Sequence, residues 1–252
     1  MASVKPKKHL GQHFLKDENI ALKIVEALKN QDQLPVLEIG PGTGVLTKYL
    51  LEKPGLDFYA LDIDTESIDY LKAQYPNQAN HFLFQDYLKY DVPFDRFNVI
   101  GNFPYNISSQ LFFKIWDDRD QVEEVVCMIQ KEVADRISAK HGNKTYGILS
   151  VLLQAFFDIE YLFKVPPGVF NPPPKVQSAV IRLNRNETKY LTCDEQMFKR
   201  VVKAGFGKRR KTLRNALKDL NLPDAVKALP VMDLRAEQLS VQEFISLTEK
   251  IA

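Results

Sequence analysis

The chain of 252 residues is 45% apolar and 26% charged with a formal net charge of +2, which is ordinary for a globular protein. No apolar run reaches the roughly twenty residues that a membrane-spanning helix needs, and the sequence shows no repeat or low-complexity tract. The two cysteines show no metal-ligand spacing and no signal peptide is apparent, so we expect a cytoplasmic protein without a bound metal.

The first predicted helix spans residues 20–28, and a glycine-rich junction follows it. The run 34–44 is typical of a strand that ends in glycines at alternate positions, and a helix-like stretch follows it. Such glycines let the backbone turn sharply beside a ligand, and the next helix offers unpaired N–H groups. A nicotinamide-binding loop needs G-x-G-x-x-G, and Val45 departs from that spacing. We therefore expect S-adenosylmethionine, which carries no pyrophosphate, beside Gly40 and Gly42.

Two further strands are predicted to end in carboxylates. The stretch 58–64 places Asp62 and Ile63 about twenty residues after the glycines, where an acid accepts hydrogen bonds from both ribose hydroxyls of a bound nucleoside. The stretch 80–86 ends in Asp86, an acceptor for an adenine amine. Either aspartate alone could simply begin a turn or cap a helix. Two of them at successive strand ends favour a cofactor pocket.

The tetrapeptide Asn102-Phe103-Pro104-Tyr105 follows the next apolar run, 97–101. It offers two carbonyl oxygens and a flat ring at one point, which suits an amino group on a planar base. Asn and Pro are also ordinary turn residues, so the motif gains its meaning from the pocket that precedes it.

Strands and helices continue to alternate, which predicts an α/β fold with a mostly parallel sheet of seven strands. Only the proline-rich loop 166–176 separates the last two strands, so we expect them to form an antiparallel pair at one edge. The character changes to short helices from residue 187, which predicts a first domain at 1–186 and a small helical domain at 187–252. The other expected elements are helices at 108–116, 131–138 and 148–156 and strands at 123–130, 158–165 and 178–185.

The predicted helical domain is rich in positive charge. Nine basic residues and no acidic one stand between Lys199 and Lys218, and a second basic segment lies at residues 5–9. Such blocks bind polyanions more often than they form solvated helix faces, which is the alternative. We expect contacts with the phosphate groups of a polyanion, which weaken as salt rises. The expected contact residues are Lys208, Arg209, Arg210, Lys211 and Arg214.

Five stretches form a series along the chain, namely 11–15 (Gly-Gln-His-Phe-Leu), 38–44, 102–105, 170–178 (with Pro-Pro-Pro-Lys-Val) and 206–217 (with Lys-Arg-Arg-Lys-Thr-Leu). In this order they resemble the small-subunit ribosomal RNA adenine dimethyltransferases of the KsgA type. The resemblance implies a Rossmann-like class I methyltransferase domain and a helical RNA-binding domain. It also implies methyl transfer from S-adenosylmethionine to the N6 of two adjacent adenines in a hairpin near the 3′ end of small-subunit rRNA. The partner would be a pre-assembled small ribosomal subunit during its biogenesis, and we expect a monomer.

The resemblance assigns site residues as well. His13 stands where the family commonly has Asn, so its role could be a backbone contact that tolerates many side chains. Asp62 replaces a common Glu, and we expect the ribose contact to survive with a small backbone adjustment. Phe103 replaces a more usual Leu. The cofactor contacts that the resemblance implies fall on His13, Leu15, Gly40, Asp62, Asp86 and Asn102.

A mechanism can be formulated for the target amine, whose lone pair is delocalised into the ring. We hypothesise that the Asn102 side-chain oxygen and the Phe103 carbonyl accept its two N–H groups and favour a tetrahedral nitrogen. Tyr105 would stack on one face of the extruded base and Phe170 on the other. No strong general base is needed, because the alkylated nitrogen becomes acidic, so positioning and electrostatics carry the step.

Three alternatives remain at this point. A large-subunit rRNA adenine methyltransferase would share the motif at 102–105, but we do not expect the basic segment in this form there. A non-catalytic RNA-binding or ribosome-assembly factor is disfavoured by the intact cofactor pocket, and thermal stabilisation by S-adenosylmethionine would discriminate it. A nicotinamide oxidoreductase is disfavoured by Val45 and by the lack of a convincing hydride-transfer acid.

Overall fold

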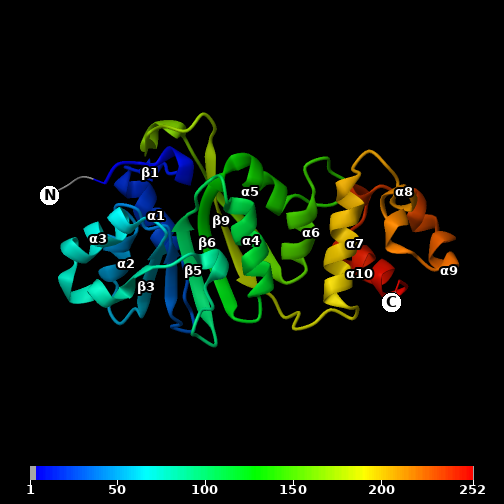
Figure 1. The fold of residues 1–252 in the computed structure, drawn as a ribbon, viewed down its shortest axis with the longest axis horizontal. Helices are drawn as coiled ribbons and strands as arrows, with labels where there is room; N and C mark the ends of the chain where they lie inside the picture. The colour runs from blue at the N-terminus through cyan, green and yellow to red at the C-terminus, as the bar shows by residue number, and fades with distance from the viewer. Residues whose placement is uncertain (1–3, 252) are drawn as a thin grey trace. The chain divides into compact units, whose positions relative to one another are not determined.

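The computed structural model describes residues 4–251, which divide into two compact units. The first unit takes the described residues up to Ala134 together with 159–185. The second takes 135–158 and the described residues from Asn186 onward. Figure 1 traces the elements along the chain by colour.

The first unit is built on a seven-stranded sheet with the strand order β4-β3-β2-β5-β6-β9-β7. Strands β2 to β6 run parallel to one another, and β9 is antiparallel to β6. The expected mostly parallel sheet with antiparallel pairing toward one edge is confirmed. The strands are β2 Val36–Ile39, β3 Phe58–Asp62, β4 Phe82–Phe84, β5 Phe97–Asn102, β6 Val122–Gln130, β7 Phe157–Val165 and β9 Ser178–Arg185.

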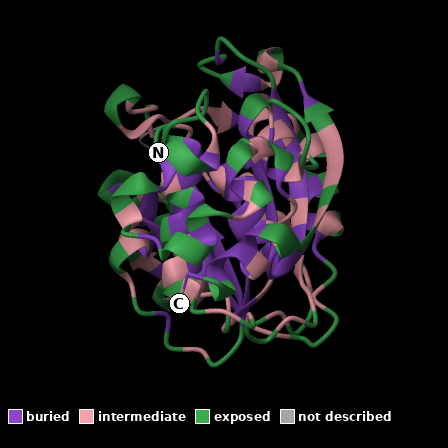
Figure 2. Cartoon of the chain, turned by 90° about the vertical axis from the view of Figure 1, so that its right-hand side faces the viewer, coloured by how far each residue is buried: buried purple, intermediate pink, exposed green. Residues whose placement is uncertain are grey.

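Apolar strands form the centre of this unit. Every residue of β2 is buried, as happens when helices cover both faces of a parallel strand. Asp17 and Asp64 are the N-caps of helices α1 and α3, and their side chains accept backbone N–H groups of the first turn. Figure 2 shows buried residues, in purple, toward the interior, and exposed residues, in green, on the outer helices and loops. The helices are α1 Glu18–Ala27, α2 Thr47–Leu51, α3 Thr65–Gln74, α4 Ser108–Asp117 and α5 Lys131–Ser138, which continues into the second unit.

Two regions of the first unit differ from the sequence expectation. The strand expected at 80–86 is only β4, because the 3-10 turns η2 Pro76–His81 and η3 Tyr87–Lys89 occupy its flanks. The loop at 166–176 holds the 3-10 turn η4 Pro167–Val169 and the short strand β8 Phe170–Asn171. Strand β8 pairs antiparallel with β1 Phe14–Leu15, and a further 3-10 turn, η1 Lys8–Leu10, precedes it in the chain.

The second unit is helical but larger than the expected domain, because residues 135–158 belong to it as well as those after 185. Its helix α6 Ile148–Gln154 is buried along five consecutive residues and packs against α7 and α10, which explains why one cut near 186 does not divide the chain. No helix among residues 4–251 combines the length and apolar character needed to cross a membrane. The other helices are α7 Glu195–Gly207, α8 Leu213–Ala216, α9 Asp224–Lys227 and α10 Val241–Glu249, with 3-10 turns η5 Lys218–Leu220, η6 Pro230–Asp233 and η7 Ala236–Gln238.

Candidate active site

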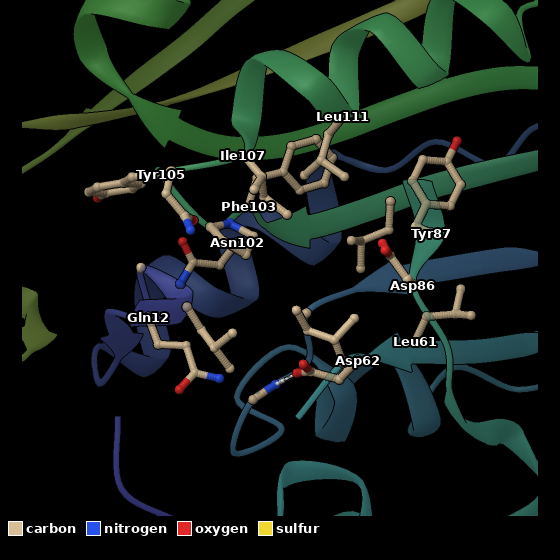
Figure 3. Close-up of a pocket in the computed structure, with 18 of the residues that line it drawn as sticks. Gln12, Leu61, Asp62, Asp86, Tyr87, Asn102, Phe103, Tyr105, Ile107 and Leu111 are labelled. Atoms are coloured by element: carbon tan, nitrogen blue, oxygen red, sulfur yellow. Dashed lines mark hydrogen bonds between the residues drawn. The ribbon is translucent and has the colours of Figure 1, made fainter. Parts of the chain in front are cut away.

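A pocket opens at the carboxyl ends of β2, β3, β4 and β5. Ligands of open α/β sheets bind at this edge, because parallel strands present their carboxyl ends together there. Figure 3 shows side chains converging on the pocket from several elements, and the N-terminal residues 10–14 form one of its walls. The expected site residues that line the pocket are His13, Gly40, Gly42, Asp62, Ile63, Asp86, Asn102, Phe103, Pro104 and Tyr105.

Asp62 ends β3 with its carboxylate turned toward the glycine loop (Figure 3). It accepts hydrogen bonds from the Gly42 N–H at 3.4 Å and from the Asp64 N–H at 2.9 Å. Gly42 has a φ of +56°, and a Cβ there would come within 2.9 Å of the Phe14 ring, so glycine is required. Burial raises the pKa of Asp62 to about 6, in spite of these hydrogen bonds.

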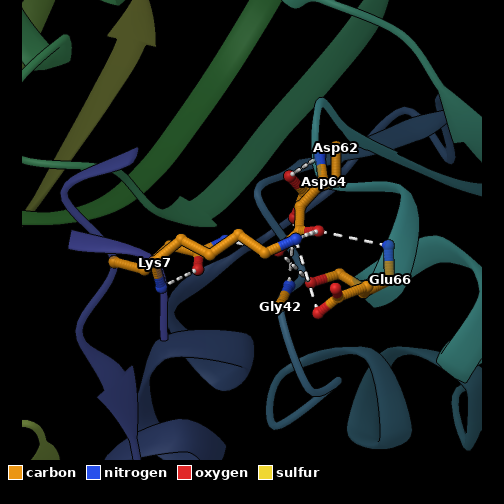
Figure 4. Close-up of polar contacts among 7 residues, drawn as sticks. Lys7, Gly42, Asp62, Asp64 and Glu66 are labelled. Carbon is orange, nitrogen blue, oxygen red and sulfur yellow. Dashed lines mark hydrogen bonds and ion pairs between the residues drawn. The ribbon is translucent and has the colours of Figure 1, made fainter. Parts of the chain in front are cut away.

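A partly buried ion pair ties the N-terminal segment to the loop after β3 (Figure 4). The Asp64 carboxylate accepts hydrogen bonds from Lys7 Nζ at 2.6 Å and from Gln12 Nε2 at 3.1 Å, and its side chain has no exposed surface. Burial acts to raise the pKa of Asp64, but the hydrogen bonds from Lys7 and Gln12 outweigh it and lower the pKa. Asp64 is therefore ionised, and it holds residues 10–14 where they line the pocket.

Asn102 ends β5 with its amide fixed on one side only. Its Nδ2 donates to the His13 carbonyl at 2.9 Å, while its Oδ1 is buried and has no hydrogen-bond partner among the described residues. Leaving a buried acceptor unpaired costs about 1–3 kcal/mol, so such an atom calls for an explanation. An acceptor at a pocket wall is explained by a ligand that donates to it.

The residues after Asn102 add an aromatic wall. The Phe103 ring is buried against Phe112, so its backbone is the part that can serve the pocket. Pro104 lies between this residue and Tyr105, whose hydroxyl is hydrogen-bonded to Ser178 at the start of β9. The Tyr105 ring also stacks on the imidazole of His13, with ring centroids 5.1 Å apart and planes inclined by 30°.

Phe170 and Leu15 do not line this pocket. They face each other across the β1–β8 pair and are 1% and 3% exposed, packed in the core of the first unit. The structure therefore does not place Phe170 where it would cover a base, because the strand pairing turns its ring inward. Leu15 lines a smaller neighbouring cavity beside Gly40, Gly42 and Asn102.

Sequence reasoning missed the contacts that position the N-terminal wall. Gln12 bonds to Asp64, 52 positions away, and Asn106 donates to the His9 carbonyl, 97 positions away. Gly11 has a φ of +65°, and a Cβ there would come within 2.5 Å of Asn106 Oδ1. The series at 11–15 was visible in the sequence, but no spacing rule connects it to residues so distant.

The five expected RNA contacts of the second unit fall into two groups. The side chains of Arg210 and Lys211 have no hydrogen bond or ion pair with other residues in the described part of the chain. The other three also hold the unit together. These contacts join Lys208 to Asp219 at 2.9 Å, Arg209 to the Tyr146 carbonyl at 3.3 Å, and Arg214 to Asp233 at 2.8 Å and to the Lys227 carbonyl.

A family model described as ribosomal RNA adenine dimethylase matches residues 3–252. The chain belongs to this family. Relatives named ribosomal RNA small subunit methyltransferase A agree with the assignment over the whole length. The relative from Cytophaga hutchinsonii is 57% identical and covers 100% of this chain and 99% of its own, and that from Flavobacterium johnsoniae is 55% identical and covers 100% and 97%.

Solved structures of similar fold include a dimethyladenosine transferase from Plasmodium falciparum. It is 30% identical, covers 93% of this chain and 96% of its own, and superposes with a TM-score of 0.78. The 23S rRNA methyltransferase ErmE covers 93% and 99% with a TM-score of 0.69, and at 24% identity this likeness shows the fold alone. Family and fold therefore both place the chain among the class I methyltransferases.

Proposed function

We propose that this protein dimethylates the exocyclic N6 of two adjacent adenines in a hairpin near the 3′ end of small-subunit rRNA, with S-adenosylmethionine as the methyl donor. The observation that carries the proposal is the buried Oδ1 of Asn102, which has no hydrogen-bond partner among residues 4–251 and lines the same pocket as Tyr105 and Asp62. The full-length relatives named small subunit methyltransferase A support the choice of RNA.

The pocket fits S-adenosylmethionine by the chemistry of its walls. Asp62 faces the pocket as an acceptor for ribose hydroxyls. Asp86 lies two residues after β4 as an acceptor for the adenine amine, and its Oδ1 also accepts the Leu88 N–H at the start of η3. Ile63 is 46% exposed there and offers an apolar contact to the base. Gly40 and Gly42 leave the loop without side chains on this side. Bound here, S-adenosylmethionine would supply an electrophilic methyl group.

The acceptor side is arranged for an amine that must be reoriented. The Asn102 oxygen and the Phe103 carbonyl accept the two N–H groups of the adenine amine and direct its lone pair away from the ring system. Hydrogen bonds in a buried setting act at a low dielectric constant, so two acceptors have a large effect on the nitrogen. Tyr105 stacks on the extruded base. After the first transfer one N–H remains, and the same acceptors serve the second.

The second unit is proposed as the RNA-binding domain. Arg210 and Lys211 supply charges that no other described residue neutralises, so they are available to phosphates. We propose a pre-assembled small subunit as the substrate, met by a monomer in the cytoplasm. The relatives' printed name supports the subunit, and the assembly state rests on the resemblance.

A second candidate is methylation of large-subunit RNA. Structural likeness to a 23S rRNA methyltransferase favours it, but that likeness extends to the fold only.

One experiment separates methylation of small-subunit RNA from methylation of large-subunit RNA. The protein is incubated with labelled S-adenosylmethionine and either unmethylated small subunits, unmethylated large subunits or free RNA, and modified bases are mapped. We expect two dimethylated adenines on small subunits. Label on large-subunit RNA alone would overturn the proposal, and an absence of label with intact cofactor binding would favour a non-catalytic assembly factor.

A further inference from the structure

His13 contacts three separate parts of the acceptor side of the pocket. Its backbone carbonyl accepts the Asn102 amide at 2.9 Å, and its ring stacks on Tyr105 at 5.1 Å between centroids. Its Nδ1 lies 2.8 Å from the Pro172 carbonyl, in the loop that follows β8. These contacts connect His13 with Asn102 and Tyr105, the two residues proposed to hold the target base, and with the loop after β8.

The backbone contact decides which way the Asn102 amide faces. Because Nδ2 donates to the His13 carbonyl, Oδ1 is the amide atom left without a partner in the described part of the chain. The reversed amide would oppose an N–H donor to the amine of the base, which is also a donor, and would repel it. The position of the His13 backbone therefore fixes the acceptor that the reaction needs.

The ring contact decides which face of Tyr105 is open. The phenol is fixed at its hydroxyl by Ser178, and the imidazole covers one face of the ring. An adenine that stacks on Tyr105 must then use the opposite face. A carbonyl oxygen can only accept a hydrogen bond, so Nδ1 of His13 carries the proton and donates to the Pro172 carbonyl. This hydrogen bond fixes the orientation of the imidazole against Tyr105.

We propose that His13 is a positioning residue for the methyl acceptor, which fixes the amide of Asn102 through its carbonyl and backs the ring of Tyr105 with its imidazole. This inference rests on the proposed function. It goes beyond the cofactor contact expected at this position, because the Asn102 amide and the Tyr105 ring are the groups proposed to hold the methyl acceptor. The side chain, which replaces a common Asn, then contributes to the reaction through Tyr105.

The test compares His13→Ala and His13→Phe with the wild type and with His9→Ala as the matched control. His9 lies in the same segment with an exposed side chain. Methyl transfer to unmethylated small subunits gives kcat and the KM for the subunit, and calorimetry gives the Kd for S-adenosylmethionine. We expect His13→Ala to lower kcat at least tenfold with the Kd changed less than threefold. His13→Phe, which keeps a flat ring, should recover kcat to within about threefold of wild type.

The outcomes that overturn the inference are distinct. A kcat for His13→Ala within threefold of wild type, or a lower KM for the subunit, would show that the imidazole does not support the acceptor or even blocks it. A loss confined to cofactor affinity, or no recovery in His13→Phe, would assign the residue to another role. If His13→Ala does not fold, His13→Leu takes its place. Wild-type protein that transfers no methyl group to RNA would refute the proposed function, which is a separate result.

Discussion

At the scale of single residues, two aspartates that are two positions apart have pKa values shifted in opposite directions. Burial raises the pKa of Asp62 to about 6, whereas Lys7 and Gln12 lower the pKa of the equally enclosed Asp64. The difference arises from their partners, because Asp62 receives only backbone N–H groups and Asp64 receives a cation. Asp62, which we propose as the cofactor-binding acid, is thus the one that loses its charge more readily as the pH falls, and Asp64 keeps its charge to lower pH.

This difference predicts a pH dependence of cofactor binding. The raised pKa means that free Asp62 takes up a proton as the pH falls through about 6, and a protonated acid is a poorer acceptor for two ribose hydroxyls. We expect the Kd for S-adenosylmethionine to be steady above pH 7 and to rise up to about tenfold for each unit below pH 6. Calorimetry between pH 5 and 8 measures it. Asp62→Asn should bind more weakly at pH 7.5 and lose this slope, and a wild-type Kd that stays flat would contradict the prediction.

At the scale of elements, the site depends on segments far apart in the chain meeting at the carboxyl edge of the sheet. Strands β2, β3 and β5 bring the glycine loop, Asp62 and Asn102 together, because parallel neighbours end at the same edge. The N-terminal segment forms the remaining wall. It is attached at one end by the Lys7–Asp64 pair and at the other by the β1–β8 pair.

Removing the first attachment should loosen this wall. Lys7→Ala leaves the buried Asp64 carboxylate without its cation, and we expect S-adenosylmethionine to bind about tenfold more weakly, a loss of about 1.4 kcal/mol. Lys8→Ala is the matched control, since Lys8 is the next residue and is exposed. Calorimetry at pH 7.5 compares the two variants. Equal affinities of the two variants for S-adenosylmethionine would show that the Lys7–Asp64 ion pair does not hold the N-terminal wall in place.

At the scale of the whole molecule, the charge of the second unit serves two purposes that the sequence does not distinguish. Arg214 donates to Asp233 and to the Lys227 carbonyl, so it joins segments of this unit. Arg210 and Lys211 make no such contacts among the described residues. The same basic block therefore contains both structural and available charges.

Substitutions should separate these roles. Replacing Arg210 and Lys211 with Ala should weaken RNA binding and reduce the slope of log affinity against log salt by roughly one to two, with the melting temperature unchanged. Arg214→Ala should instead lower the melting temperature by a few degrees, since its pair with Asp233 is partly exposed. Filter binding over a salt series and thermal melting provide the measurements. A double variant with an unaltered salt slope would refute the division.

Much of this organisation can be predicted from the sequence, for reasons visible in particular residues. The stretches 58–64, 80–86 and 97–101 are apolar runs followed by polar residues, and parallel topology then places Asp62, Asp86 and Asn102 at one edge. Contacts across the chain follow no such rule, so the Lys7–Asp64 pair and the stacking of His13 on Tyr105 were not foreseen. Phe170 was expected at the base, and its pairing opposite Leu15 turns it into the core.

The helix at 148–156 shows a second limit. It was correctly expected as an apolar helix, but the expected domain boundary at residue 186 placed it in the first domain, whereas it belongs to the second unit. A helix buried on all sides needs partners around it, and α7 and α10, which lie far along the chain, provide them. The domain division therefore depends on packing that becomes visible only in three dimensions.

The most direct test of the central claim is the single-turnover rate of methyl transfer by Asn102→Ala. Unmethylated small subunits are used at saturating S-adenosylmethionine, so that any loss of cofactor affinity does not enter, and a melting curve confirms the fold. If the Asn102 oxygen orients the amine, the rate should fall by about a hundredfold or more, as for other acceptors or donors that act on a transition state. A rate within about tenfold of wild type would contradict the account.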